Sequence, residues 1–151
     1  MTTRHCRVAL PGVVAALAYL QGGCAFIHRY EDVAIGVFGP TGEPVKGVQV
    51  GVSPSASKVN YPDGDREQTR RDGFASLRIP VDTHMTINFV EPGGKDGFKM
   101  AGRFTSPGSG EFTVGGGAEV ASYEVTQPYR LTLRLAKPWR EIVVEAEARR
   151  R

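Results

Sequence analysis

The fold of this chain is decided by two short stretches, Gly42-Glu-Pro-Val-Lys-Gly-Val-Gln-Val-Gly-Val52 and Arg71-Asp-Gly-Phe-Ala-Ser-Leu-Arg-Ile-Pro80. In the first, valines at every second position alternate with Gln49 and Gly51, which leaves one face apolar, as a half-buried β-strand requires. In the second, apolar side chains alternate with polar ones from Phe74 until the closing proline. Both stretches therefore predict strands that pack on one side.

Tight turns precede both expected strands. Gly42 and Pro44 interrupt the chain before the first one, because Gly admits positive φ while Pro fixes φ and lacks a backbone donor. Gly47 is assigned to the same turn region. The pair Asp72-Gly73 predicts a two-residue hairpin turn with positive φ at both central positions. We expect these five residues to be structural turn positions.

The pattern Gly-x-Pro-Val-x-Gly-Val-x-Val, followed after a polar loop by Asp-Gly-Phe-Ala-x-Leu-x-Ile-Pro, resembles the carboxypeptidase regulatory-like domains. These belong to the transthyretin-like group of bacterial β-sandwich modules, which is related in architecture to immunoglobulin-like repeats. The resemblance covers the region from Val33 to Val90. It implies an all-β, Greek-key β-sandwich of about seven to nine strands. Such a domain is a passive or binding module of an envelope protein, and the resemblance transfers fold better than function.

The rest of the chain also favours an all-β domain, because 19 Gly and 10 Pro with 9% aromatic residues are typical of many turns and short strands. A long polar loop, 53–70, is expected to hide short strands near 57–61 and 67–70. Trp139 is expected to close the core, with an exposed binding position as the alternative. The other strands are expected at 33–38, 85–91, 98–104, 111–114, 119–126, 129–136 and 142–146.

The first residues have the form of an export signal. A basic start with Arg4 and Arg7 precedes an apolar run, Val8 to Leu20, that is short for a membrane span. The run ends in Gln21-Gly-Gly-Cys24-Ala25, which resembles a bacterial lipobox, where small residues precede a Cys that is acylated. The sequence departs from the pattern at Gln21, since Leu is preferred three residues before the Cys.

Three outcomes stay open for this segment: acylation of Cys24, cleavage after Ala25 to give a soluble secreted protein, or no cleavage. We favour a lipoprotein, with a signal peptide at 1–23, a tether at 24–32, a β-sandwich at 33–147 and a basic tail at 148–151. The second cysteine, Cys6, also lies in the signal, so no disulfide is expected in the sandwich.

Charge gives little indication of partners. The net charge is +3 for the whole chain, and removal of Arg4 and Arg7 with the signal lowers it by two, so nucleic acid is not expected as a partner. The densest basic run is Arg149 to Arg151. These three residues could touch anionic headgroups, but a solvated chain end is the favoured interpretation.

Few residues offer catalytic or metal-binding chemistry. Asp82 and His84 lie close in sequence but have no nucleophile beside them, so loop positions are expected. Asp63, Asp65 and Asp72 could supply oxygen ligands to Ca²⁺, but Asp-Gly pairs are first of all turn formers. The chain also lacks a Gly-x-Ser-x-Gly elbow and His-rich metal spacing. We therefore expect no catalytic residue, no metal and no cofactor.

The sequence thus predicts a non-enzymatic cell-envelope lipoprotein, anchored to a bacterial membrane through Cys24 on the periplasmic or cell-surface side. Its sandwich would bind another envelope protein or a polysaccharide, or serve as a structural element. Two alternatives remain. A periplasmic hydrolase would gather His84 or His28 with carboxylates in a deep pocket, and a secreted inhibitor would present a rigid loop near 54–64.

Overall fold

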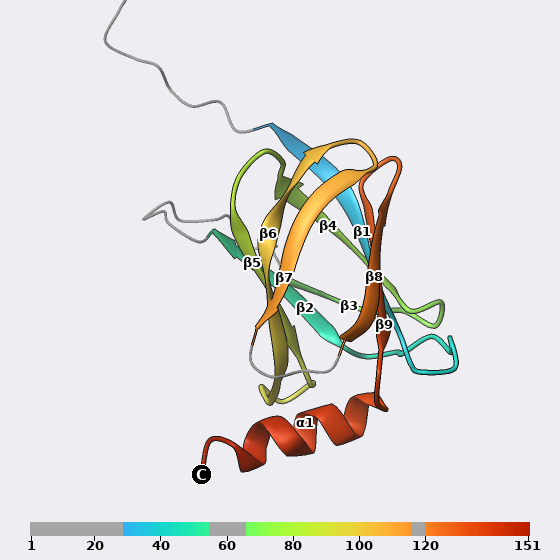
Figure 1. The fold of residues 1–151 in the computed structure, drawn as a ribbon, viewed down its shortest axis with the longest axis vertical. Coiled ribbons are helices and arrows are strands. Elements are labelled where there is room, and N and C mark those ends of the chain that lie inside the picture. The colour runs from blue at the N-terminus through green and yellow to red at the C-terminus, as the bar shows by residue number, and fades with distance from the viewer. Residues whose placement is uncertain (1–28, 55–65, 116–119) are drawn as a thin grey trace, which may run out of the picture.

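The computed structural model describes residues 29–54, 66–115 and 120–151. These residues form two sheets of four and five strands, packed face to face, and one helix (Figure 1). The expected β-sandwich is therefore confirmed at this level. The elements are β1 (Tyr30–Phe38), β2 (Gln49–Pro54), β3 (Arg66–Gln68), β4 (Phe74–Pro80), β5 (Met85–Val90), β6 (Asp96–Ser106), β7 (Ser109–Gly115), β8 (Val120–Thr126), β9 (Arg130–Leu135) and α1 (Trp139–Ala148).

The two sheets differ in how their strands pair. The five-stranded sheet has the order β3-β2-β5-β6-β7, and all its neighbours are antiparallel. The four-stranded sheet has the order β4-β1-β9-β8, in which β1 pairs antiparallel with β4 but parallel with β9. The chain passes from one sheet to the other four times along its length.

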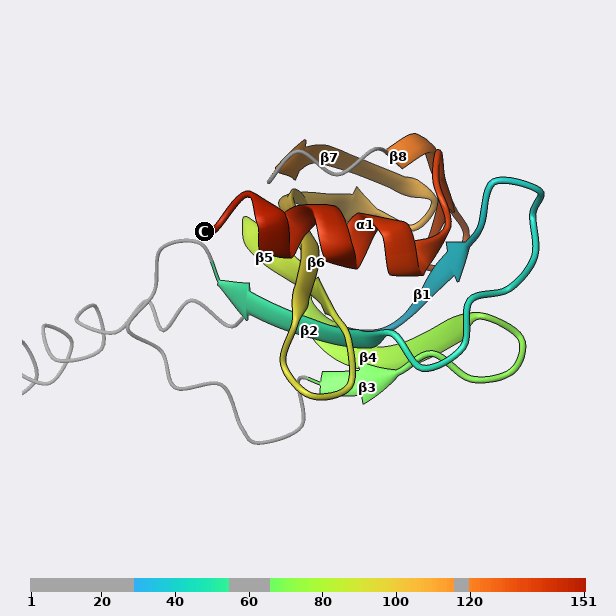
Figure 2. The same cartoon turned by 90° about the horizontal axis from the view of Figure 1, so that it is seen from below.

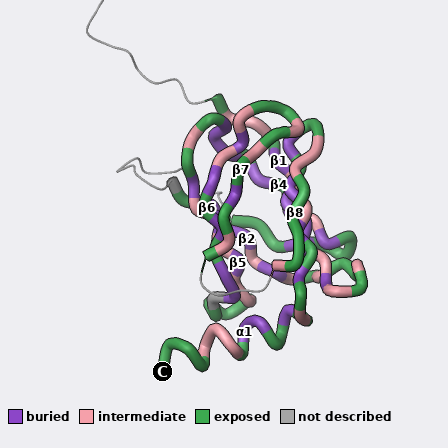
Figure 3. The backbone as a smooth tube through the Cα atoms, viewed as in Figure 1, coloured by how far each residue is buried: buried purple, intermediate pink, exposed green. Residues whose placement is uncertain are grey.

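The core lies between the sheets and follows from the alternation of side chains along each strand. In β9, Leu131, Leu133 and Leu135 are fully buried, while Arg130 and Arg134 are exposed. Strand β5 repeats the pattern with a buried Met, Ile and Phe at alternate positions. Figure 3 shows this alternation as buried and exposed segments along the strands. Burial of each such side chain stabilises the fold by about 1.5–3 kcal/mol.

The turn between β3 and β4 differs from the expected two-residue hairpin. The N–H of Gly73 donates to the carbonyl of Arg70 at 3.0 Å, and the N–H of Arg70 donates to the carbonyl of Phe74 at 2.9 Å, so three residues form the connection. Gly73 has φ of +82°, but Asp72 has no positive φ. Instead, its carboxylate accepts from the N–H of Phe74 at 3.1 Å. The connection is therefore a three-residue turn in which only the last residue, Gly73, is left-handed, and it joins strands of two different sheets.

The strand expected at 142–146 is wrong, because α1 (Trp139–Ala148) occupies this part of the chain. Its buried residues are Trp139, Ile142 and Val143, whose spacing places them on one helical face, whereas Val144 is 63% exposed. Pro138 precedes the first turn, where its missing N–H costs nothing. The helix lies across one end of the sandwich (Figure 2). Among the described residues, no helix is long and apolar enough to cross a membrane.

Trp139 is buried, as expected, and explains why the helix docks there. Its indole ring makes an edge contact with Phe98, with centroids 6.1 Å apart, and it lies over Gly97 at the start of β6. A Cβ at Gly97 would come within 2.4 Å of the indole, so the glycine provides the room. Ala148, the first residue of the expected basic tail at 148–151, is the last residue of α1, and the N–H of Arg149 donates to the carbonyl of Glu145.

Other element boundaries shift by a few residues. Strand β1 begins at Tyr30, three residues earlier than expected, and β6 reaches from Asp96 to Ser106. The short strand expected near 67–70 is present as β3. The strand expected at 57–61 lies outside the described residues.

Candidate functional site

The predicted turn residues come together at one end of the sandwich. Gly42, Gly47 and Gly73 have φ of +88°, +84° and +82°, as a left-handed turn position requires. Pro44 forms a bridge with Phe38, and an added Cβ at Gly73 would come within 3.0 Å of Pro44. The two turns therefore pack on each other. Backbone hydrogen bonds hold both turns, since the N–H groups of Gly42, Gly47 and Gly73 all donate to carbonyl oxygens.

Several other predicted residues are not among those that the structure describes. The predicted lipidation site Cys24 lies outside the described residues, as do Asp63, Asp65 and His28. Within the described ranges, no group of three or more His, Cys, Asp or Glu side chains is placed to hold a metal ion.

Asp82 and His84 lie in the connection between β4 and β5, and both are exposed. Asp82 has φ of 59°, and its N–H donates to the carbonyl of Phe104 at 2.7 Å, which fixes the turn.

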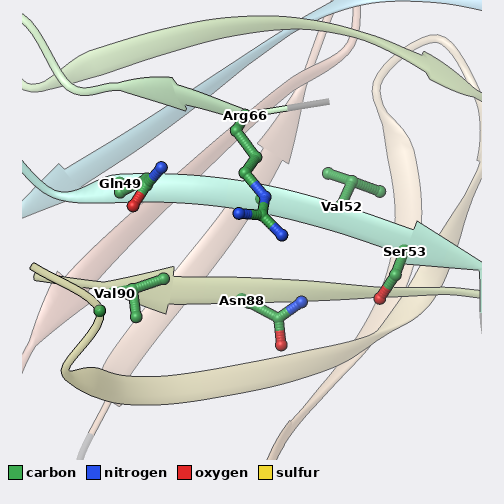
Figure 4. A pocket seen from close by; sticks show the side chains of 8 residues that line it. Gln49, Val52, Ser53, Arg66, Asn88 and Val90 are labelled. Atoms are coloured by element: carbon green, nitrogen blue, oxygen red, sulfur yellow. The ribbon is translucent and has the colours of Figure 1, made fainter. Parts of the chain in front are cut away.

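A shallow pocket of about 340 Å³, which we call the recess, lies on the outer face of the five-stranded sheet. Strands β2, β3 and β5 and the turn after β5 form its walls (Figure 4). The side chains that give it chemical character are Gln49, Ser53, Arg66, Asn88 and Val90.

The pocket forms here because of strand alternation and one glycine. In β2 the buried valines point into the core, so Gln49, Gly51 and Ser53 point outward. Gly51 pairs with Asn88 on one side and with Arg66 on the other. Since Gly51 has no side chain, it leaves a depression between these two neighbours. Figure 4 shows the Arg66 side chain lying across β2.

The lining groups are suited to recognition by hydrogen bonds. Arg66 offers a planar fork of donors, the amides of Gln49 and Asn88 each offer a donor and an acceptor, and Ser53 adds a hydroxyl. Such a set fits a carboxylate or a group of hydroxyls on a ligand. None of the described residues that line the pocket carries a carboxylate, an imidazole or a thiol.

Sequence reasoning missed this pocket. The alternation in 48–52 already places Gln49 and Gly51 on the outer face, and the alternation in 85–91 does the same for Asn88. The missing information is the register, which brings Arg66 beside Gly51 from a short strand after the polar loop. A glycine at an outward position flanked by polar residues was the available signal.

Comparisons with protein-family models, with curated proteins and with solved structures find no match. The fold and the site define the chain as a β-sandwich, mostly of strands, with a polar recess on one outer face.

Proposed function

We propose that this protein is an exported cell-envelope lipoprotein whose β-sandwich is a non-enzymatic binding or structural module. In this proposal Cys24 carries the lipid, and the domain lies on the periplasmic or cell-surface side. We further propose that the sandwich is of the Greek-key, transthyretin-like kind and is similar to carboxypeptidase regulatory-like domains. The sequence motifs at 42–52 and 71–80 support this, since they form β2 with its preceding turn and β4 with its preceding turn.

The observation that carries the binding role is the recess around Gly51. Its guanidinium, amide and hydroxyl groups lie on a sheet, so the backbone hydrogen bonds of β2, β3 and β5 hold their positions. Groups placed on rigid strands recognise a ligand with little ordering cost. The recess fits a hydroxyl-bearing or carboxylate-bearing part of an envelope protein or a polysaccharide.

The position of Cys24 determines how far the sandwich can extend from a membrane. Strand β1 begins at Tyr30, six residues after this cysteine. Six extended residues span at most about 20 Å, so a lipid on Cys24 would hold the sandwich close to the bilayer surface. The partner would then be found within a short distance of that surface.

The anchor is tested by expressing the full chain in a bacterium and separating membrane from soluble fractions. Cys24→Ala should move the protein to the soluble fraction, while the matched control Cys6→Ala should leave it with the membrane. Wild-type protein in the soluble fraction, or a Cys24→Ala protein that stays with the membrane after a salt wash, would contradict the anchor.

The recess is tested by nuclear magnetic resonance with glucuronate and N-acetylglucosamine as small probes. Binding should shift the amide signals of Gly51 and Asn88, and Arg66→Gln should weaken the response to glucuronate. If neither probe shifts these signals, the recess does not bind sugars or sugar acids, and the structural role is favoured over binding.

A further inference from the structure

The outer face of the four-stranded sheet carries Arg78, Arg130 and Arg134 together with two phenylalanines, and its acidic residues are Asp32, which pairs with Arg78, and Glu124, which pairs with Thr132. Because the apolar residues of β1, β4 and β9 turn inward, the positions between them form this face. Parallel pairing of β1 with β9 places Phe38 beside Arg134, and Gly36 lies between Phe74 and Thr132. We call the surface formed by Phe38, Phe74, Arg130 and Arg134 the arginine face.

Arg130 is held in place by an aromatic ring. Its guanidinium carbon lies 4.5 Å from the centroid of the Phe74 ring, which is a cation–π contact. The Phe74 ring makes an edge contact with Phe38, with centroids 5.4 Å apart. The ring also lies over Gly36, where an added Cβ would come within 2.4 Å of it. Stacking orients the guanidinium plane and leaves its N–H edge available to an acidic group.

Arg134 supplies a second guanidinium on the same face. Its Nη2 lies close to Gly42, 3.1 Å from where a Cβ would stand. The nearby carboxylate of Glu43 accepts hydrogen bonds from the backbone N–H and the hydroxyl of Thr41. These bonds are the main reason that the pKa of Glu43 is lowered, and Arg134 contributes less. Within the described residues, neither Arg130 nor Arg134 forms an ion pair within 4.0 Å.

The spacing of the two arginines favours a polymer. Arg130 and Arg134 are four residues apart on one strand, so their Cα atoms are separated by about 13 Å. Each guanidinium has its own neighbour, Phe74 for Arg130 and Gly42 for Arg134, and a chain with repeated charges can contact both.

The apolar part of this face is small, because Phe38 and Phe74 are half-buried and Arg130 covers the Phe74 ring. Within the described ranges, the large hydrophobic residues that are exposed are Tyr123 and Val144, on β8 and α1. Tyr123 pairs with the inward-facing Leu133, so it does not belong to the arginine face. Protein interfaces have a desolvated core rich in aromatic residues. A polar, charged polymer fits this surface better.

We propose that the arginine face binds an acidic polysaccharide, whose carboxylate or sulfate groups accept hydrogen bonds from Arg130 and Arg134. This surface lies on a different sheet from the recess at Gly51, so the inference stands apart from the recess and from the lipid anchor.

The test uses the full chain with Cys24→Ala and fluorescent oligogalacturonate, with binding followed by anisotropy at two salt concentrations. Arg130→Gln and Arg134→Gln should each weaken binding about tenfold, the effect of losing one charge-assisted hydrogen-bonding group. Arg140→Gln, which removes the same charge from an exposed position of α1, should change the affinity less than about twofold. Neutral dextran should not bind.

A further variant separates ordered recognition from net charge. Phe74→Leu keeps every arginine but removes the stacking ring, and it should weaken binding about threefold. Thermal unfolding of each variant checks that the sandwich remains folded.

Three results would overturn the proposal. One is an equal loss of affinity in Arg140→Gln, which would indicate attraction by net charge alone. Another is tighter binding to polyglutamate or to vesicles containing phosphatidylglycerol than to oligogalacturonate, which would replace the polysaccharide by an acidic protein or a membrane. The third is the absence of binding to oligogalacturonate at the lower salt concentration.

Discussion

Thr69 connects the turn before β4 to the start of β2. Its hydroxyl donates to the carbonyl of Val45 at 2.6 Å and accepts from the N–H of Val48 at 3.0 Å. The backbone adds two more bonds, from the N–H of Thr69 to the carbonyl of Val48 and from the N–H of Gly47 to the carbonyl of Thr69, both 2.9 Å. Thr69 is only 2% exposed, so water cannot replace its hydroxyl.

Thr69→Val keeps the shape of the side chain but removes both hydroxyl bonds. The N–H of Val48 would then be buried without an acceptor, at a cost of about 1–3 kcal/mol, and the lost bond to Val45 adds about 1 kcal/mol. The free energy of unfolding should therefore fall by about 3 kcal/mol, which lowers the melting temperature by roughly 10 °C for a domain of this size.

Urea unfolding followed by circular dichroism measures this change. Thr69→Ser is the matched control, because it keeps the hydroxyl and loses one methyl group, which costs about 1 kcal/mol. Thr113→Val, at an exposed position of β7, should change stability by less than about 0.5 kcal/mol. If Thr69→Val is as stable as Thr69→Ser, the hydroxyl does not hold these segments together.

Three other predictions concern packing and charge. Trp139→Ala should lower the free energy of unfolding, measured in urea, by about 3–5 kcal/mol, because it removes the side chain that packs α1 against Phe98 of β6. An unchanged free energy of unfolding would contradict the docking of the helix. Gly102→Ala should destabilise the sheet by about 1–3 kcal/mol or more in thermal melts, since its Cβ would collide with the carbonyl oxygen of Glu111, and a neutral effect would contradict the β6–β7 register. A hydrogen bond from Lys137 lowers the pKa of the Glu145 carboxyl in the folded protein. The stabilisation from this pair is therefore fully present above the pKa of the carboxyl in the unfolded chain. It is lost as the pH falls through the lower pKa of the folded protein. Lys137→Met should raise that pKa toward the usual value in a carboxyl titration by nuclear magnetic resonance, whereas an unchanged pKa would mean that the bond is absent in solution.

The strands could be predicted because their side chains alternate on a two-residue period. The buried leucines of β9 and the valines of β2 lie where this period places them. The helix could not be recognised in the same way, because Ile142 to Val144 is a short β-branched run that suits a strand as well as a buried helical turn. What decides the outcome is tertiary: Trp139 needs the space over Gly97, and a helix brings Ile142 and Val143 to the same side.

The surfaces depend on pairing between distant segments, and sequence alone does not contain that information. Outward positions such as Gln49 and Arg130 follow from alternation, but their neighbours do not. Arg66 reaches the recess through antiparallel pairing of β3 with β2, and Arg134 lies beside Phe38 through the parallel pairing of β1 with β9. The turn glycines were easier to predict because positive φ is a local requirement that few other residues satisfy.

The proposed lipid anchor is tested most directly by the intact mass of the mature protein purified from a bacterial membrane. We expect a chain that begins at Cys24 and carries the added mass of a diacylglyceryl group, and no such addition when Cys24 is replaced by alanine. A mature chain that begins at Phe26 without added mass, or one that still begins at Met1, would contradict the proposal that this sandwich is held at the membrane by a lipid.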